Sequence, residues 1–186
     1  MDNQIIDRLL ENQRIIDARL RDLETREYIQ RTQHAALNLI KIGDVVAIGY
    51  SSANERGFLN KIINRTGHTS VKGELISCST SADREAILQA NEYDTFGVVA
   101  ESGVAQGSEM WAWMTGSVAQ VLYKNSVAAT RGNILIAADT DGRAIDIANP
   151  GGGLPGTDTH FKECGHVMET KSAGTNVLVL AVLHFN

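Results

Sequence analysis

A heptad pattern near the start of the chain sets the first constraint on what it can fold into. With Ile6 placed at position a, the a and d positions hold Ile6, Leu9, Gln13, Ile16, Leu20 and Leu23. All of these residues except Gln13 are aliphatic. Alternating three- and four-residue spacing places such side chains in one narrow stripe on a helix, which is typical of a coiled-coil seam. Residues 6–24 therefore predict a helix that buries its stripe against other helices.

The charged residues beside the seam indicate how many helices pack together. Arg19 at position g and Glu24 at the following e are placed to pair between neighbouring chains. Residues 19–24, RLRDLE, also resemble a short signature of parallel three-stranded coiled coils. The pattern ends at Glu27 and Gln30, and a lone helix of about three heptads is marginal in water. We therefore expect a homotrimer; the alternative is an amphipathic helix folded back on its own domain.

The pattern changes to short strands in the rest of the chain, and we place the boundary near Ala35, between a coil (1–34) and a globular domain (35–186). Many segments after Gly43 are short, rich in β-branched residues and bounded by glycine or polar residues. The predicted strands are Asp44–Tyr50, Glu74–Cys78, Glu85–Ala90, Phe96–Glu101, Glu109–Thr115, Val118–Tyr123, Asn133–Ala138, Arg143–Ala148, His160–Glu169 and Asn176–Phe185. Phe58–Ile63 is ambiguous between a strand and a helical turn. This spacing predicts a mainly β domain, a small barrel or sandwich.

One turn and two strands carry more specific predictions. Asp141-Gly142 separates two predicted strands, and Asp-Gly is a favoured two-residue hairpin turn because both central residues need positive φ. The segments 110–114 and 176–183 are apolar at almost every position, although one face of a small barrel strand normally meets solvent. We therefore expect a second buried surface on these strands, supplied by contact between subunits.

Composition excludes several classes of function. The chain has 186 residues and a net charge of −5, which is not the electrostatic footprint of a nucleic-acid-binding protein. No apolar run approaches the roughly 20 residues that a membrane span requires, and no hydrophobic signal core precedes the domain, so we expect neither membrane insertion nor Sec export. Two cysteines, Cys78 and Cys164, are too few for a disulfide framework and are expected to be free thiols packed within strands.

Three polar segments could carry chemistry, and each has a simpler interpretation. Glu163 with Cys164 and His166 could supply a nucleophile and its base or part of a metal site, since residues 164 and 166 share one face of a regular strand. No further Cys/His cluster completes a tetrahedral set by spacing, so a packed strand with an incidental histidine is favoured. Residues 139–142, DTDG, begin like a calcium loop but lack its later glutamate. Gly151–Gly153 is not followed by the Gly-Lys-Ser/Thr of a phosphate-binding loop.

The paired tryptophans Trp111 and Trp113 are the remaining candidates for ligand binding. Aromatic rings can stack on sugars, although packing in a core or an interface is their more common use. The sequence thus presents no catalytic residues, metal site or cofactor, and we expect a protein that is not an enzyme.

A succession of short motifs resembles a phage structural family. Residues 64–76 follow the pattern N-x-T-G-x-x-x-x-K-G-x-x-(apolar). The later motifs are Phe96–Glu101, Gly107, Met114–Val118, Thr130–Leu135, Glu163–Glu169 and an apolar strand reaching Phe185. In this order they look like the small β-barrel of tailed-phage capsid decoration (cement) and head-fibre proteins, over roughly 64–186.

That resemblance implies a bacteriophage virion structural protein without catalytic activity. It would be a homotrimer on the capsid surface, assembled in the host cytoplasm, that binds the major capsid protein and stabilises the head. Related modules occur in tail and collar proteins, so a tail-fibre or collar adaptor is the alternative, and a carbohydrate (receptor)-binding virion module is another. The N-terminal coil and the glycine-rich insertion before Thr157 depart from minimal cement proteins, and the coil favours a projecting, fibre-like variant.

If the seam holds the chains together, charged residues at two of its positions should separate them. Replacing Leu20 and Leu23 by Asp would bury carboxylates between helices, which is strongly unfavourable. Light scattering should report a trimer for the unmodified chain and a smaller species for the double variant. A monomeric unmodified chain would contradict the prediction.

Overall fold

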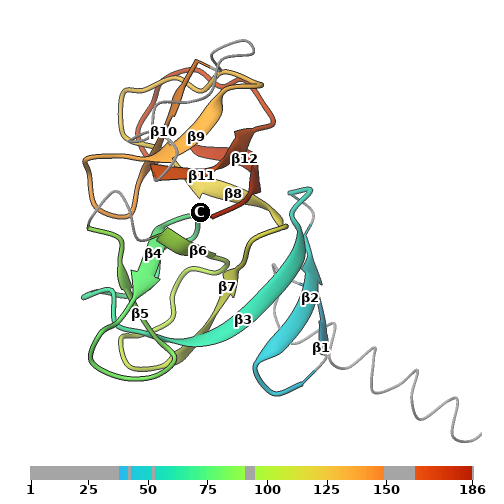
Figure 1. The fold of residues 1–186 in the computed structure, drawn as a ribbon, viewed down its shortest axis with the longest axis vertical. Coiled ribbons are helices and arrows are strands. Elements are labelled where there is room, and N and C mark those ends of the chain that lie inside the picture. The colour runs from blue at the N-terminus through green and yellow to red at the C-terminus, as the bar shows by residue number, and fades with distance from the viewer. Residues whose placement is uncertain (1–37, 42, 52, 91–94, 149–161, 186) are drawn as a thin grey trace, which may run out of the picture.

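The computed structural model describes residues 38–41, 43–51, 53–90, 95–148 and 162–185 (Figure 1). The predicted coil of residues 1–34, with its seam from Ile6 to Leu23 and its Arg19–Glu24 pairing, lies outside the described residues, as does Gly151–Gly153.

The described residues form twelve β-strands, which confirms a mainly β domain. They are β1 (Asn38–Lys41), β2 (Val46–Tyr50), β3 (Arg56–Asn64), β4 (Leu75–Cys78), β5 (Glu85–Leu88), β6 (Thr95–Val99), β7 (Glu109–Trp113), β8 (Val118–Leu122), β9 (Ile134–Ala137), β10 (Ala144–Ile147), β11 (Glu163–Val167) and β12 (Leu178–Leu183). Every predicted strand has its counterpart, and the ambiguous segment Phe58–Ile63 lies within β3. Only β1 was not predicted, because the preceding helical pattern obscures a strand of four residues.

Five strands close into a barrel. β3 is parallel to β5 and antiparallel to β7, and β5, β4, β6 and β7 pair in that order, so the ring returns to β3. Each strand of this ring contributes to one small buried cluster, made of Ile62, Ile76, Ala86, Val99, Met110 and Ala112. The period of two in a strand explains this, since alternate residues of every strand point to the barrel interior.

Five of the remaining strands form a second curled sheet beside the barrel, while β1 and β2 pair along β3. Its order is β8-β12-β11-β9-β10, and a bridge between Tyr123 and Ala144 links its first and last strands. Figure 1 shows this group packed over the end of the β3–β7 barrel. Main-chain hydrogen bonds join the two parts, including Leu122 N to Gly73 O at 2.7 Å and Leu75 N to Gly142 O at 2.9 Å. The larger core cluster spans both parts.

The two segments predicted to be apolar on both faces form β7 and β12, and their apolar character has different explanations. For β7, the expected contact between subunits is wrong. Met110 and Ala112 point into the barrel, while Trp111 and Trp113 belong to the larger core cluster with 2% and 0% of their surface exposed. Both faces of β7 are therefore buried within one chain. β12 alternates after all, because its residues are alternately half-buried and buried from Leu178 to Leu183.

The hairpin between β9 and β10 is confirmed, but its turn is longer than predicted. Ala138 N donates to Arg143 O at 2.8 Å and Arg143 N donates to Thr140 O at 3.1 Å, which leaves four residues, 139–142, in the loop. Gly142 has φ +68°, as expected, whereas Asp141 does not have positive φ. The turn is therefore not the two-residue type that requires positive φ at both central positions.

Gly142 and Gly132 form a matched pair for testing the cost of side chains in these turns. Both have positive φ, so alanine is strained at each by about 1–3 kcal/mol. A Cβ at Gly142 would lie 2.5 Å from Leu88 Cδ1, whereas nothing lies within 4 Å of a Cβ at Gly132. We expect Gly142→Ala to lower the melting temperature more than Gly132→Ala. Equal melting temperatures for the two variants would show that the contact with Leu88 is unimportant.

Candidate functional site

The most conspicuous surface feature is an apolar row across β1, β2 and β3. Ile48 of β2 lies opposite Ile40 of β1 on one side and opposite Phe58 of β3 on the other. These three side chains are 39%, 41% and 52% exposed, and Tyr50, two residues further along β2, is 42% exposed. We call Ile40, Ile48, Tyr50 and Phe58 the apolar row. Large hydrophobic side chains that share one exposed face mark interaction sites more often than scattered ones do.

The opposite face of the same strands explains why large side chains point outward. Leu39, Ala47 and Leu59 are buried there, and a Cβ at Gly49 would lie 2.2 Å from Leu59 Cδ1 and 3.1 Å from Trp113 Cη2. Only small residues of β2 fit over this part of the core, so its larger residues occupy the outer face. In the sequence this appears as alternation of large and small residues in Val46–Tyr50, a pattern of side-chain size that hydrophobicity alone does not reveal.

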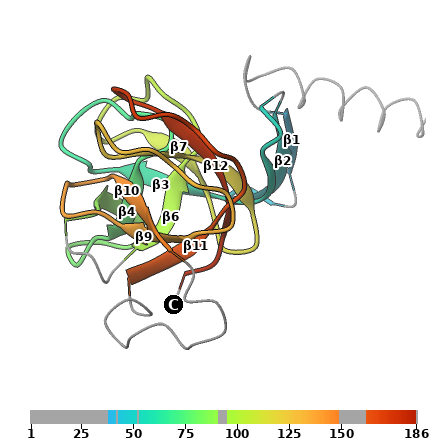
Figure 2. The same cartoon turned by 90° about the horizontal axis from the view of Figure 1, so that it is seen from above.

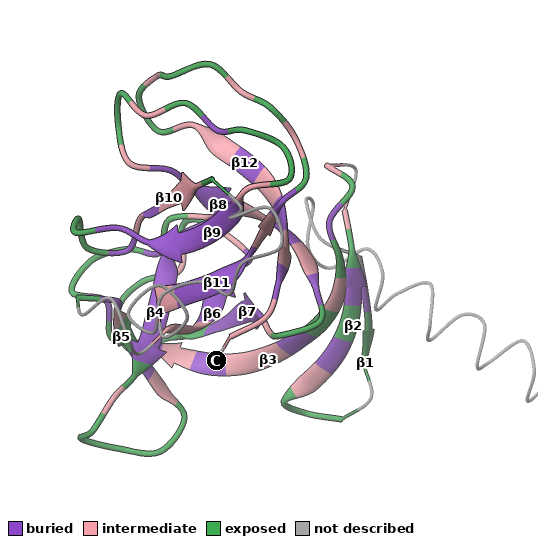
Figure 3. Cartoon of the chain, turned by 45° about the horizontal axis from the view of Figure 1, so that its top comes forward, coloured by how far each residue is buried: buried purple, intermediate pink, exposed green. Residues whose placement is uncertain are grey.

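The apolar row stands at one side of the molecule. Seen from above in Figure 2, β1 and β2 lie apart from β4, β9 and β10. β1 pairs only with β2 among the described strands, so no described strand lies along its other edge. Figure 3 shows exposed segments on β1 and β2, whereas β9 and β11 are buried along most of their length. An exposed edge with an apolar face is a natural place for another chain to pack.

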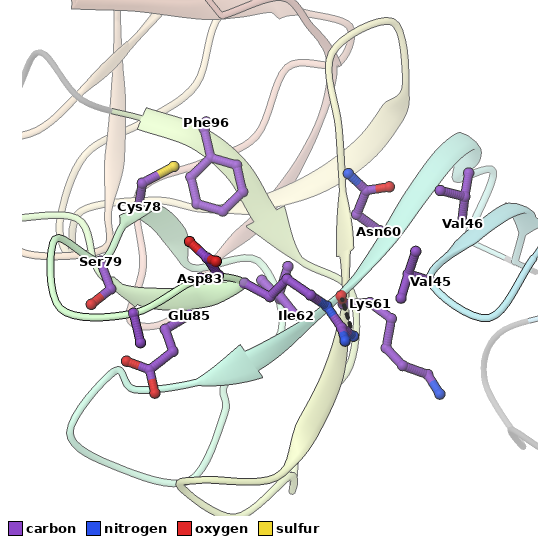
Figure 4. Close-up of a pocket in the computed structure, with 12 residues that line it drawn as sticks. Val45, Val46, Asn60, Lys61, Ile62, Cys78, Ser79, Asp83, Glu85 and Phe96 are labelled. Atoms are coloured by element: carbon purple, nitrogen blue, oxygen red, sulfur yellow. Dashed lines mark hydrogen bonds between the residues drawn. The ribbon is translucent and has the colours of Figure 1, made fainter.

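A surface groove of about 450 Å³ lies beside this sheet. Figure 4 shows Phe96 and Cys78 toward one end of it, Val45 and Val46 at the other, and Ile62 between them. Charged groups at its rim are engaged in ion pairs: Lys61 and Arg84 each lie 3.1 Å from Glu109, and Arg65 lies 2.7 Å from Glu85. Lys61 and Arg84 lower the pKa of Glu109, chiefly through the hydrogen bond from Lys61.

The loop that carries the phage-like pattern is organised by Asn64. Its side chain is fully buried, donates to His68 O at 3.0 Å and to Val104 O at 2.9 Å, and accepts hydrogen bonds from Thr66 N and Thr66 Oγ1. A buried amide that satisfies these main-chain groups fixes the path of the loop. The asparagine and threonine of the pattern therefore have structural roles, and the exposed residues 67–69 form the loop tip.

The lysine of the same pattern pairs with a buried carboxylate. Lys72 Nζ lies 2.6 Å from Glu55 Oε2, and the Glu55 side chain is 0% exposed. Ser51 Oγ donates to the same carboxylate oxygen at 2.6 Å, and Gln120 N donates to Glu55 Oε1 at 3.1 Å. A buried charge is tolerated only when it is paired and hydrogen-bonded in this way. The pair ties the loop before β4 to the residues preceding β3 and to β8.

The tryptophans proposed for interface contact or sugar stacking are in the core. Trp111 and Trp113 are buried, so neither ring face is available to a sugar or to another subunit in this structure. Lys61 Nζ lies 5.6 Å from the centre of a Trp111 ring and covers it from the groove side. The carbohydrate-binding alternative therefore loses the residues that suggested it.

The predicted Cys164–His166 pair is separated by a bulge in β11. The pairing of β11 with β9 shifts register between Glu163 and Gly165, and Gly165 has φ +148°. The period of two therefore fails: Cys164 joins the core, while His166 is 39% exposed and contacts Glu163. Burial raises the pKa of Cys164 to about 12, so its thiol is neutral and unsuited to nucleophilic attack. Both cysteines are free, as predicted, but Cys78 is exposed.

The segment that begins like a calcium loop serves as the β9–β10 hairpin. Asp139 pairs with Lys124, and the hydrogen bond and charge of Lys124 lower the pKa of Asp139. His184 lies beyond β12 and contacts Glu163. Residue spacing in the sequence did not predict this contact. Antiparallel pairing of two strands could have suggested it, because the end of β12 must then pass the start of β11.

No protein-family model matches the chain, and a search of curated proteins finds no significant match. In the described part of the chain, no helix has the length and apolar character needed to cross a membrane. The functional assignment therefore depends on the fold and on the surfaces described above.

Two lysines provide a test of the buried ion pair. Lys72→Met leaves the Glu55 carboxylate buried without its cation, which should lower the free energy of unfolding by about 3 kcal/mol. Lys124→Met removes the partner of the exposed Asp139 and should cause no measurable change, since exposed ion pairs contribute little. Urea unfolding of both variants measures the difference. Equal effects would show that the buried Glu55 carboxylate does not need Lys72 as its partner.

Proposed function

We propose that this protein is a homotrimeric structural protein of a bacteriophage virion, a capsid decoration or head-fibre protein that binds the major capsid protein and stabilises the head. The observation that carries the proposal is the apolar row of Ile40, Ile48, Tyr50 and Phe58 on an edge sheet. It is a surface for another copy of the same chain. The phage-like order of motifs in residues 64–185 supports the virion assignment.

The predicted seam lies shortly before β1 in the chain, which favours another copy of this chain as the partner that packs on the apolar row. The predicted three-stranded seam ends at Leu23, and β1 begins at Asn38. A parallel trimer of seams would bring three β1 edges together around one axis, because each domain is tethered only a short distance from it. The local concentration of each row near its neighbours would then be high, so modest contacts suffice for a stable assembly.

Attachment to a shell uses other surfaces of the domain. The loop tip at residues 67–69 is exposed, while Asn64 and the Glu55–Lys72 pair hold its base. Loops on a rigid β scaffold commonly carry recognition. Three identical loops in one trimer would contact three neighbouring capsid subunits, and three linked weak contacts give firm attachment without a large single interface.

A tail-fibre or collar adaptor is the alternative within the same class of protein. It shares the trimer and the barrel but attaches at the tail or the portal vertex. Co-sedimentation of the purified protein with particles that lack it, followed by imaging, separates the two: binding across the head supports decoration, and binding confined to the tail supports the adaptor. A chain truncated by residues 1–31 should bind more weakly, because it loses trivalency.

Serine in the apolar row provides the test of the proposed subunit surface. Ile48→Ser with Phe58→Ser removes the two central side chains and should raise the concentration at which the trimer dissociates by at least about tenfold. Met168→Ser is the control, because Met168 is also exposed, at 38%, but lies after β11. Sedimentation equilibrium measures both variants. Unchanged dissociation in the double variant would remove the apolar row from the interface.

A further inference from the structure

Two histidines and a glutamate converge where β11 passes the end of β12. Glu163 and His166 belong to β11, and His184 follows Leu183, the last residue of β12, which pairs with Gly165. The potential ligand atoms of Glu163, His166 and His184 all lie within 4.8 Å of one another, and no other such group of three occurs among the described residues. The bulge at Glu163–Gly165 creates the arrangement, because it turns His166 to the same side as Glu163.

The two separations measured from Glu163 match the edges of a metal site better than they match hydrogen bonds. Glu163 Oε1 lies 3.3 Å from His184 Nε2 and 3.6 Å from His166 Nε2. An N–H···O hydrogen bond is normally 2.7–3.2 Å long. Metal–ligand bonds of about 2.0–2.2 Å to a tetrahedral Zn²⁺ place neighbouring ligand atoms about 3.3–3.6 Å apart. The two imidazole rings, 5.0 Å apart between centroids and tilted by 47°, do not stack face to face.

We propose that Glu163, His166 and His184 bind a divalent transition-metal ion of the Zn²⁺ type, with water in the remaining position. Two imidazoles and one carboxylate form a donor set that suits such ions. The Glu163 side chain is only 8% exposed, so little water competes with an ion for its carboxylate oxygens. Each histidine is more than a third exposed, which leaves the ion a path from solvent. Cys164 contributes no ligand because its side chain lies in the buried core.

The ion would connect two neighbouring strands near the C-terminal end of the chain. It would hold His184, just beyond β12, against β11, and so restrain the open end of the β8–β12 sheet. A ligand that binds only the folded state raises stability in proportion to the logarithm of its concentration above its dissociation constant. This role is independent of the proposed trimer and of any attachment to a capsid.

Cobalt(II) is the probe for the site, because four-coordinate Co²⁺ absorbs visible light. Untagged full-length protein, stripped with a chelator, is titrated with CoCl₂ and then with ZnCl₂. The expected result is one Co²⁺ per chain, an intense visible band without sulfur charge transfer, and loss of that band as Zn²⁺ displaces Co²⁺. Zn²⁺ should also raise the melting temperature of the stripped protein by several degrees.

Variants identify the ligands. His166→Ala and His184→Ala should each abolish the visible band and the Zn²⁺-dependent rise in melting temperature, and Glu163→Gln should weaken binding at least about tenfold. His68→Ala is the matched control, since His68 also contacts a carboxylate, Glu74, at 3.5 Å but belongs to no such group of three among the described residues. It should bind Co²⁺ as the unmodified protein does.

Folding of the variants is checked without metal. His166 and His184 are partly exposed, so the metal-free alanine variants should keep the circular dichroism spectrum of the unmodified protein. If either variant unfolds, Glu163→Gln alone decides the ligand assignment. Absence of a visible band in the unmodified protein, or an unchanged band in folded His166→Ala and His184→Ala, would overturn the proposal.

Discussion

The pairing of β3 is the constraint on which the rest of the structure depends. Over its nine residues β3 pairs with β2, β5, β7 and β8. Its second half closes the barrel between β5 and β7, while its first half carries the β1–β2 hairpin and touches β8. Because side chains alternate along a strand, one register fixes both faces. Ile62 then points into the barrel, Leu59 lies against Trp113, and Phe58 is left on the outer face.

Buried polar groups keep the loops of this fold in place. Asn64 satisfies main-chain groups of two loops, and Glu55 receives hydrogen bonds from Ser51 and from the main chain of β8 while it pairs with Lys72. These buried groups add little net stability to the fold, since the cost of removing them from water offsets much of the attraction between them. Their effect is specificity, because any other loop path would leave a buried charge or amide unpaired. Asn64, Thr66 and Lys72, three residues of the phage-like pattern, therefore also hold loops of this fold in place.

Strands were predictable from the sequence because β-branched segments between turn residues mark them locally. The features that were missed depend on tertiary contacts. The apolar faces of β7 suggested a subunit interface, but the β1–β2 hairpin covers Trp113 within the same chain. A bulge, which shifts the period of two, separated Cys164 from His166 and brought His166 to Glu163. His184 joined that group through strand pairing, which residue spacing along one strand does not reveal.

The apolar row connects the fold to the proposed role, since one chain leaves Ile40, Ile48, Tyr50 and Phe58 in water while it buries the other face of the same strands. A cryo-EM reconstruction of a particle carrying this protein tests that connection most directly. The account predicts trimers on the capsid surface, with β1 and the apolar row of each copy facing its neighbours around the three-fold axis. Copies confined to the tail or portal, or trimers in which the row faces solvent, would contradict it.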